Sequence, residues 1–185
     1  MLPAEIKRHR FTADEYHRMV EVGLLEEDAR VELVGGEIVE MSPIGWPHAR
    51  CVNRLTKLLV RLVGERYEIS VRNPIALSDI DEPQPDLALI REDALRNRAP
   101  TPEDVLLVVE VSDTTLAYDK NIKLPLYAQA RIPEVWIVDL QNRRVEVYTE
   151  PGPDGYRAVQ RFDPGEPLQS GTAEELSLRV DEVFG

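Results

Sequence analysis

The sequence lacks most of the features that would place it in a common functional class. Cys51 is the only cysteine, so neither an intrachain disulfide nor a cysteine-cluster zinc site can form. No GxGxxG or GxxxxGK[ST] motif occurs, which excludes the usual phosphate-binding loops. Ser42 and Ser112 lie outside any nucleophile-elbow motif, so serine hydrolase chemistry has no support.

Long apolar runs are also missing. No segment approaches the ~18 apolar residues of a membrane span, and no apolar stretch follows the basic N-terminal residues. The single cysteine agrees with a reducing compartment. We therefore expect a soluble cytoplasmic protein with no membrane partner.

Positive charge is scarce. The 22 Lys and Arg residues face 34 Asp and Glu residues, giving a formal net charge of −12, which opposes indiscriminate binding to nucleic acid. Residues 46–64 contain no acidic side chain and predict a helix with a basic stripe. This stripe consists of Arg50, Arg54, Lys57 and Arg61. It could bind phosphates or an acidic patch on a second copy of the chain, so we expect a homodimer, with a plain solvated face as the alternative.

The apolar content of 43% in 185 residues suffices for one well-developed core, and we expect a single domain over residues 1–185. Thr12 and Glu15 have the spacing of a capping box, which predicts a helix to about Gly23. Gly35 and Gly36 separate two strand-like segments and suit a tight hairpin turn.

The rest of the chain alternates strands with one further helix. A helix is predicted from Thr114 or Thr115 to about Ala130, with Pro125 expected to kink it or move its start. Residues 91–104 predict a loop or broken short helix. Strands are predicted over 67–72, 75–78, 85–91, 106–113, 133–140, 143–150, 156–162 and near 176–180. This order favours an α/β or α+β fold, a central mixed sheet flanked by helices, with an N-terminal helix and hairpin.

Two carboxylates interrupt the most apolar strands. Asp86 follows Pro85 at the head of one run, and Glu110 lies inside the run LLVVEVSD. Side chains alternate along a strand, so Glu110 and Ser112 share a face, and Asp86 would lie beside Glu110 if the two strands are neighbours. A divalent cation would relieve the repulsion between such carboxylates, and oxygen ligands suit Mg²⁺ or Mn²⁺.

The helix after these strands carries a lysine on a defined face. Asp119, Lys123 and Tyr127 recur at intervals of four residues and so lie on one side of it. Lys123 could reach the metal, orient water and stabilise the extra negative charge of a displacement at phosphorus. The alternative is structural: Glu110 and Lys123 as an ion pair, Asp86 as a turn residue, or Lys123 as a solvated side chain.

Two more polar residues have ambiguous positions. Glu32 lies in the first strand of the hairpin, and the hairpin alone favours a carboxylate that faces solvent. His48 maps to the apolar side of the helix over 46–64, where a hydrogen-bonded core histidine is favoured over a ligand or base.

Taken together, PQPDLALI, VVEVSD and DKNIKLPLYAQARIPEVWIVDL resemble the PD-(D/E)XK nuclease superfamily. More closely, the chain is similar to a bacterial restriction-endonuclease-like domain family. The likeness also includes the hairpin VELVGGEIVEM and the helix that carries His48, in the family's usual order. It implies a restriction-endonuclease-like core.

The resemblance also implies roles for individual residues. Asp86 and Glu110 would be metal ligands, with the Val111 carbonyl as a further ligand. Glu32 would help complete the metal site, which reverses the interpretation drawn from the hairpin alone. The superfamily lysine would fall at Ser112, but in the closer family it lies on the following helix, where Lys123 matches better than Lys120.

The main hypothesis is therefore a Mg²⁺- or Mn²⁺-dependent endonuclease acting on DNA. Asp86, Glu110 and Glu32 would hold the metal, and Lys123 would assist the attacking water. A hypothesis of another class is a catalytically weak or inactive dimeric interaction module that retains the nuclease fold, which the net charge of −12 favours.

Overall fold

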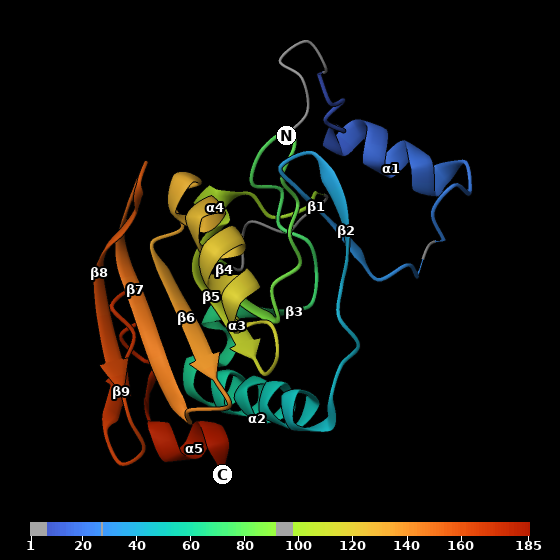
Figure 1. Cartoon of the computed structure of the whole chain (residues 1–185). Coiled ribbons are helices and arrows are strands. Elements are labelled where there is room, and N and C mark those ends of the chain that lie inside the picture. Colours follow the sequence, from blue (N-terminus) through green and yellow to red (C-terminus); the bar gives the residue numbers. More distant parts are fainter. Residues whose placement is uncertain (1–6, 27, 92–97) are drawn as a thin grey trace.

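The computed structural model of the chain describes residues 7–26, 28–91 and 98–185. Six strands form one sheet in the order β3-β4-β5-β6-β7-β8 (Figure 1). Only β5 and β6 run parallel, and every other neighbouring pair is antiparallel. The strands are β3 (Tyr67–Val71), β4 (Leu87–Arg91), β5 (Val105–Ser112), β6 (Glu134–Asp139), β7 (Arg144–Gly152) and β8 (Gly155–Phe162). The predicted mixed sheet is confirmed.

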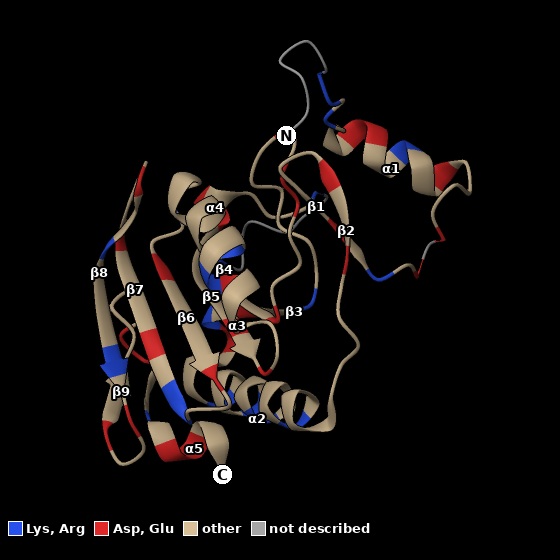
Figure 2. Ribbon diagram, in the orientation of Figure 1, with Lys and Arg blue, Asp and Glu red and all other residues tan. Residues whose placement is uncertain are grey.

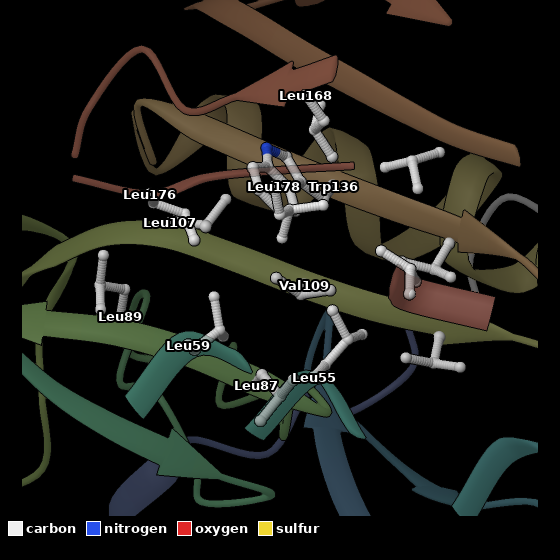
Figure 3. Close-up of a cluster of buried hydrophobic side chains, with 14 of the residues drawn as sticks. Leu55, Leu59, Leu87, Leu89, Leu107, Val109, Trp136, Leu168, Leu176 and Leu178 are labelled. Atoms are coloured by element: carbon white, nitrogen blue, oxygen red, sulfur yellow. The ribbon is translucent and has the colours of Figure 1, made fainter. Parts of the chain in front are cut away.

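One face of the sheet packs against helix α2 (Trp46–Val63) and the C-terminal segment. That segment comprises a hairpin of β9 (Pro167–Gln169) and β10 (Ser177–Arg179), followed by α5 (Val180–Phe184). Figure 3 shows the resulting core, in which apolar side chains of α2, the sheet and the C-terminal hairpin meet. Its labelled members include Leu55, Leu59, Leu87, Leu107, Val109, Trp136 and Leu168, all buried.

The other face is covered by a helix that changes type along its length. It consists of α3 (Leu116–Tyr118), the π-helical stretch η4 (Asp119–Lys123) and α4 (Leu124–Gln129). The predicted helix is therefore present, but its irregularity precedes Pro125. The Leu124 N–H donates to the Asp119 carbonyl, five residues back, so one wide turn stands before the proline.

The N-terminal part forms a smaller cluster beside the sheet (Figure 1). Helix α1 (Ala13–Glu21) begins with the predicted capping box of Thr12 and Glu15. Strands β1 (Val31–Val34) and β2 (Glu37–Glu40) form the predicted hairpin, and the glycines of its turn have positive φ angles of 59° and 73°. A bridge between Leu33 and Glu82 ties this hairpin to the segment that leads into β4.

Some predicted elements differ from the structure. The predicted strand over residues 75–78 is wrong: the segment folds back on itself, with the Ile75 N–H donating to the Pro83 carbonyl. The apolar side chains of this segment pack in the core although it has no neighbouring strand. The sequence pattern does not distinguish such a buried loop from a strand. β9 is an addition to the predicted strands, and short 3₁₀ turns occupy Gly64–Arg66 and Pro102–Asp104. Residues 92–97, predicted as a loop or broken helix, lie outside the described residues.

The basic stripe on α2 is partly used within the chain. Figure 2 shows blue segments on α2 and no red one. Arg54 donates to the carbonyls of Val183 and Phe184, and Arg61 pairs with Glu182 at 3.3 Å. Two of the four stripe residues therefore hold α5 in place. In the part of the chain that the structure describes, no helix has the length and apolarity needed to cross a membrane.

Candidate active site

Asp86 and Glu110 meet because β4 and β5 are antiparallel neighbours. Leu87 pairs with Val109, so the residue before β4 lies beside the next residue of β5. The Asp86 N–H approaches Glu110 Oε2 at 3.4 Å, and the Val111 N–H donates to Asp86 Oδ2 at 2.9 Å. The two carboxylates thus occupy the same end of the sheet, as the strand pattern predicts.

Lys123 points back from the π-helical stretch onto these strands. Its Nζ lies 2.6 Å from Glu110 Oε1 and 3.5 Å from Glu32 Oε2, and it donates to the Gln84 carbonyl at 3.3 Å. The lysine is only 4% exposed, so a solvated side chain is ruled out. The direct contact between Lys123 and Glu110 is present, whatever further role the lysine has.

Glu32 reaches the same place from the hairpin. Its Oε2 accepts from the Gln84 N–H at 2.9 Å and its Oε1 from the Tyr118 hydroxyl at 3.0 Å. With 3% exposure it does not face solvent, so the interpretation from the hairpin alone is wrong. The bridge between Leu33 of β1 and Glu82 holds the hairpin against the segment that leads into β4. The alternation of residues within the hairpin does not predict this contact.

His48 holds the Asp86 carboxylate from α2. Its Nε2 lies 2.9 Å from Asp86 Oδ2, while Arg72 Nη2 lies 3.4 Å from His48 Nδ1 and Arg72 Nε lies 3.5 Å from Asp86 Oδ1. His48 is hydrogen-bonded as favoured, but it is only partly buried and lines the cavity instead of the core. Arg72 is a site residue that the sequence does not predict, and it has a left-handed φ of 54° that no sequence pattern marks.

A second layer of hydroxyl groups supports the charged residues. Tyr127 donates to Glu110 Oε1 at 2.6 Å. Ser112 and Thr115 each donate to Asp119 Oδ2 at 2.7 Å. Ser112 therefore fixes the start of the π-helical stretch through Asp119. The sequence does not predict the roles of Tyr118 and Gln84. Tyr118 contributes a hydroxyl group and Gln84 its backbone, and neither belongs to a motif with a defined residue spacing.

The charged residues of this site line one cavity of about 500 Å³. Its lining includes all four predicted site residues, namely Glu32, Asp86, Glu110 and Lys123. Acidic side chains outnumber basic ones in the lining: Glu32, Glu40, Asp86, Glu110, Asp113 and Asp119 against Arg30, Arg72 and Lys123. The cavity is therefore suited to a cation, or to an anionic group that enters with one.

Burial shapes the electrostatics of the site. Burial, with the nearby Asp119 and Asp86 charges, raises the pKa of Glu110 to about 8 even though Lys123 opposes the rise. Burial acts in the same direction on Asp86, but the hydrogen bond and charge of His48 outweigh it and lower its pKa. Burial disfavours a charged Lys123, yet the carboxylates of Glu110 and Glu32 dominate and raise its pKa. Lys123 is thus a cation at neutral pH.

The donor set fits a metal that keeps part of its water shell. Across residues 7–26, 28–91 and 98–185, no three His, Cys, Asp or Glu side chains are arranged as a metal-binding group. Asp86 and Glu110 provide two neighbouring carboxylates on the cavity wall. Mg²⁺ is bound in this way, through one or two carboxylates together with water and substrate phosphate.

Comparisons with known proteins agree with this architecture. The Uma2 family, described as "Putative restriction endonuclease", matches residues 13–181. A solved structure from Anabaena variabilis, described as "a putative nuclease belonging to DUF820", is similar with a TM-score of 0.73 at 17% identity, covering 94% of this chain and 97% of that chain. No curated protein matches the chain.

Proposed function

Because the chain belongs to the Uma2 family of restriction-endonuclease-like proteins, we propose that it is a metal-dependent nuclease that hydrolyses phosphodiester bonds in DNA. The observation that carries the proposal is the convergence of three carboxylates and a buried ammonium group on one cavity. These are Glu32, Asp86, Glu110 and Lys123.

Asp86 and Glu110 are the residues assigned to hold Mg²⁺ or Mn²⁺. A bound ion would polarise the scissile phosphate and lower the pKa of a coordinated water. His48 and the Val111 N–H keep the Asp86 carboxylate aimed at the cavity. Tyr127 does the same for Glu110. Glu32 shares Lys123 with Glu110, which supports a role in orienting the lysine as well as in completing the acidic site.

Lys123 acts as a hydrogen-bond donor. Its pKa is raised, so the ammonium group holds its protons and does not serve as a base. A donor at this position orients the attacking water and stabilises the negative charge that builds on the phosphoryl oxygens. The low exposure of the lysine excludes competing solvent and strengthens that interaction.

The test is a Mn²⁺ titration paired with a nuclease assay. Asp86→Asn and Glu110→Gln should each weaken Mn²⁺ binding and abolish cleavage of single-stranded and duplex DNA. Glu68→Gln, the same chemical change at an exposed position of β3, is the matched control and should leave both intact. Metal binding that is indifferent to both site variants would refute the proposal.

A second candidate is a dimeric interaction module with little or no turnover. What favours it is that the carboxylates already have partners: Glu110 pairs with Lys123 and Tyr127, and Asp86 pairs with His48. Arg50 and Lys57 on α2 are exposed and could meet an acidic surface of a second copy. A stable dimer that loosens on Arg50→Gln and Lys57→Gln, in a protein that cleaves no DNA with Mn²⁺, would favour the module.

A further inference from the structure

Arg72 is the basic residue of the cavity that combines partial burial with spare hydrogen-bonding capacity. Three basic side chains line the cavity, those of Arg30, Arg72 and Lys123. Lys123 Nζ already contacts two carboxylates and a carbonyl oxygen, which match its three protons. Arg30 is exposed, where water weakens its electrostatic interactions. The Arg72 side chain is only 32% exposed and lies beside the acidic residues of the site.

The guanidinium group of Arg72 is loosely held. In the described part of the chain it makes two polar contacts: Nε lies 3.5 Å from Asp86 Oδ1, and Nη2 lies 3.4 Å from His48 Nδ1. Tight pairs of arginine with carboxylate have distances of about 2.7–2.9 Å and are often bidentate. Arg98 forms such a pair, with its two Nη atoms 2.5 and 3.0 Å from the two Asp104 oxygens. Two long contacts leave donors of Arg72 for an anion that enters the cavity.

The backbone of Arg72 is also unusual. The residue directly follows β3, and its N–H donates to the Asp86 carbonyl at 3.2 Å, so it lies opposite Asp86 at the end of the sheet that carries the site. Its φ of 54° is left-handed, which residues other than glycine seldom adopt. Arg131 shares this conformation, but it follows the end of α4, where a left-handed residue is common. Arg72 ends no helix, and such conformations gather at functional sites.

Asp86 is held mainly by groups other than Arg72. His48 and the Val111 N–H both contact Oδ2 at 2.9 Å, whereas Arg72 faces Oδ1. Burial raises the pKa of Asp86, but His48 and the Val111 N–H contribute to lowering it below its ordinary value. A guanidinium group beside a metal ligand repels the metal, unless an anion enters with the metal and accepts from that group. The position of Arg72 is therefore explained by an anionic ligand better than by support of Asp86.

We propose that Arg72 binds a non-bridging oxygen of the substrate phosphodiester, and that its long contact with Asp86 gives way to this oxygen when DNA enters the cavity. The planar guanidinium group suits a phosphate because it can donate two parallel hydrogen bonds. This assignment rests on the proposed nuclease function and adds a substrate-binding residue to it. Arg72 then contributes to the affinity for DNA and not to the affinity for the metal.

The test compares DNA binding with metal binding in Arg72→Gly, because glycine adopts the left-handed backbone freely and only the side chain is lost. Binding of an end-labelled oligothymidylate of about eight nucleotides is measured by fluorescence anisotropy with Ca²⁺, which binds the same oxygen ligands. It should weaken about tenfold, as expected when hydrogen bonds to a charged group are lost. Mn²⁺ affinity without DNA, measured by calorimetry, should be unchanged or tighter, because a positive charge beside Asp86 is removed.

A structural role for Arg72 predicts the opposite pattern, because Asp86 would then lose its support. Mn²⁺ binding that weakens in Arg72→Gly, or strand binding that does not, would overturn the proposal. Arg131→Gly is the matched control: it makes the same change at a left-handed φ of 62° outside the cavity lining, and should alter neither measurement. Arg72→Lys keeps the charge without the planar group and should recover only part of the strand affinity.

Cleavage of the same strand with Mn²⁺ separates this inference from the nuclease proposal. If Arg72→Gly weakens strand binding as expected but the wild type cleaves nothing, the phosphate contact stands and the nuclease function fails. If the wild type cleaves and Arg72→Gly keeps its strand affinity and KM, the nuclease function stands and the phosphate contact fails. Both stand if the wild type cleaves and Arg72→Gly raises KM in parallel with its loss of strand affinity.

Discussion

At the scale of single residues, the site depends on Lys123, and the nearby Lys120 is a suitable control for substitutions of that lysine. Lys123 contacts Glu110 and Glu32 in the cavity, whereas Lys120, three residues earlier, pairs with Glu146 at 2.6 Å. The sequence offers both lysines with similar spacing. Only the three-dimensional contacts separate a lysine that lines the site from one that ties the helix to β7.

Lys123→Met should lower kcat by about 10²- to 10³-fold, because a preorganised donor to the developing charge is lost. Binding of the DNA strand should weaken far less than kcat falls, since the apolar lining and the basic side chains of Arg30 and Arg72 remain. Lys120→Met, which removes an ion pair from the same helix, should keep activity within about threefold. Steady-state cleavage with Mn²⁺ measures both, and equal losses in the two variants would contradict the role given to Lys123.

The buried Glu110 makes stability depend on pH. Its pKa is about 8 in the folded chain against an ordinary value of 4.5, so between these values the folded state holds a proton that the unfolded state has released. The unfolding free energy therefore falls as pH rises through this window, at most ~1.4 kcal/mol per pH unit, and is unaffected by this group below it. Glu110→Gln keeps an acceptor for Tyr127 and Lys123 but does not titrate.

Urea unfolding is measured at about pH 5, 6.5 and 8 with EDTA present. From the lowest to the highest pH, the unfolding free energy of the wild type should fall by a few kcal/mol more than that of Glu110→Gln. Parallel pH profiles for the two proteins would show that Glu110 is ionised in the folded state throughout.

At the scale of elements, local patterns predict much of the fold and only part of the site. The hairpin, α1 with its capping box, α2 and the run of β5 follow from turn chemistry and periodicity, which are encoded in neighbouring residues. The approach of Asp86 to Glu110 follows once β4 and β5 are taken as neighbours. The contacts of Glu32, Arg72 and Tyr118 do not follow, because each depends on how separate segments pack.

The π-helical stretch is the element that sets the position of Lys123. A π turn contains one more residue than an α turn, so it rotates the residues after the turn by about 100° around the helix axis. It also precedes Pro125, whose ring would clash with a carbonyl inside a continuous α-helix. The wide turn thus accommodates the proline while it brings Asp119 and Lys123 to the site.

Deleting the exposed Asn121 should convert this turn to α-helix. Stability should fall by about 3 kcal/mol as Pro125 becomes an interior helix residue, and cleavage should be lost because Lys123 is rotated away. Adding Pro125→Ala to the deletion should recover the part of the stability that is lost at the proline but not cleavage, while Asn121→Ala alone should change neither. Thermal unfolding and the nuclease assay distinguish these outcomes, and a deletion variant that still cleaves would show that the π turn is dispensable.

At the scale of the whole molecule, the proposed nuclease is an acidic protein that would act on an anionic polymer. The net charge is −12, and half of the basic stripe on α2 is occupied by α5. Among the residues that the structure describes, three basic side chains line the cavity, those of Arg30, Arg72 and Lys123. The molecule as a whole therefore gives weak general attraction to DNA, and recognition falls to local contacts at the cavity.

This arrangement predicts a shallow dependence of binding on salt. With three phosphate-neutralising groups, and about 0.7 counterions released for each on a single strand, the slope of log K against log salt should be near −2. Binding of an end-labelled oligothymidylate, measured by fluorescence anisotropy at about 50 to 300 mM salt, gives this slope, and Arg72→Gln should reduce its magnitude by about 0.7. Arg50→Gln and Lys57→Gln together should leave it unchanged. A slope steeper than about −4 in the wild type, which becomes shallower in the Arg50→Gln/Lys57→Gln variant, would instead assign DNA binding to the α2 face. So many counterions are released only when several phosphates lie along that helix.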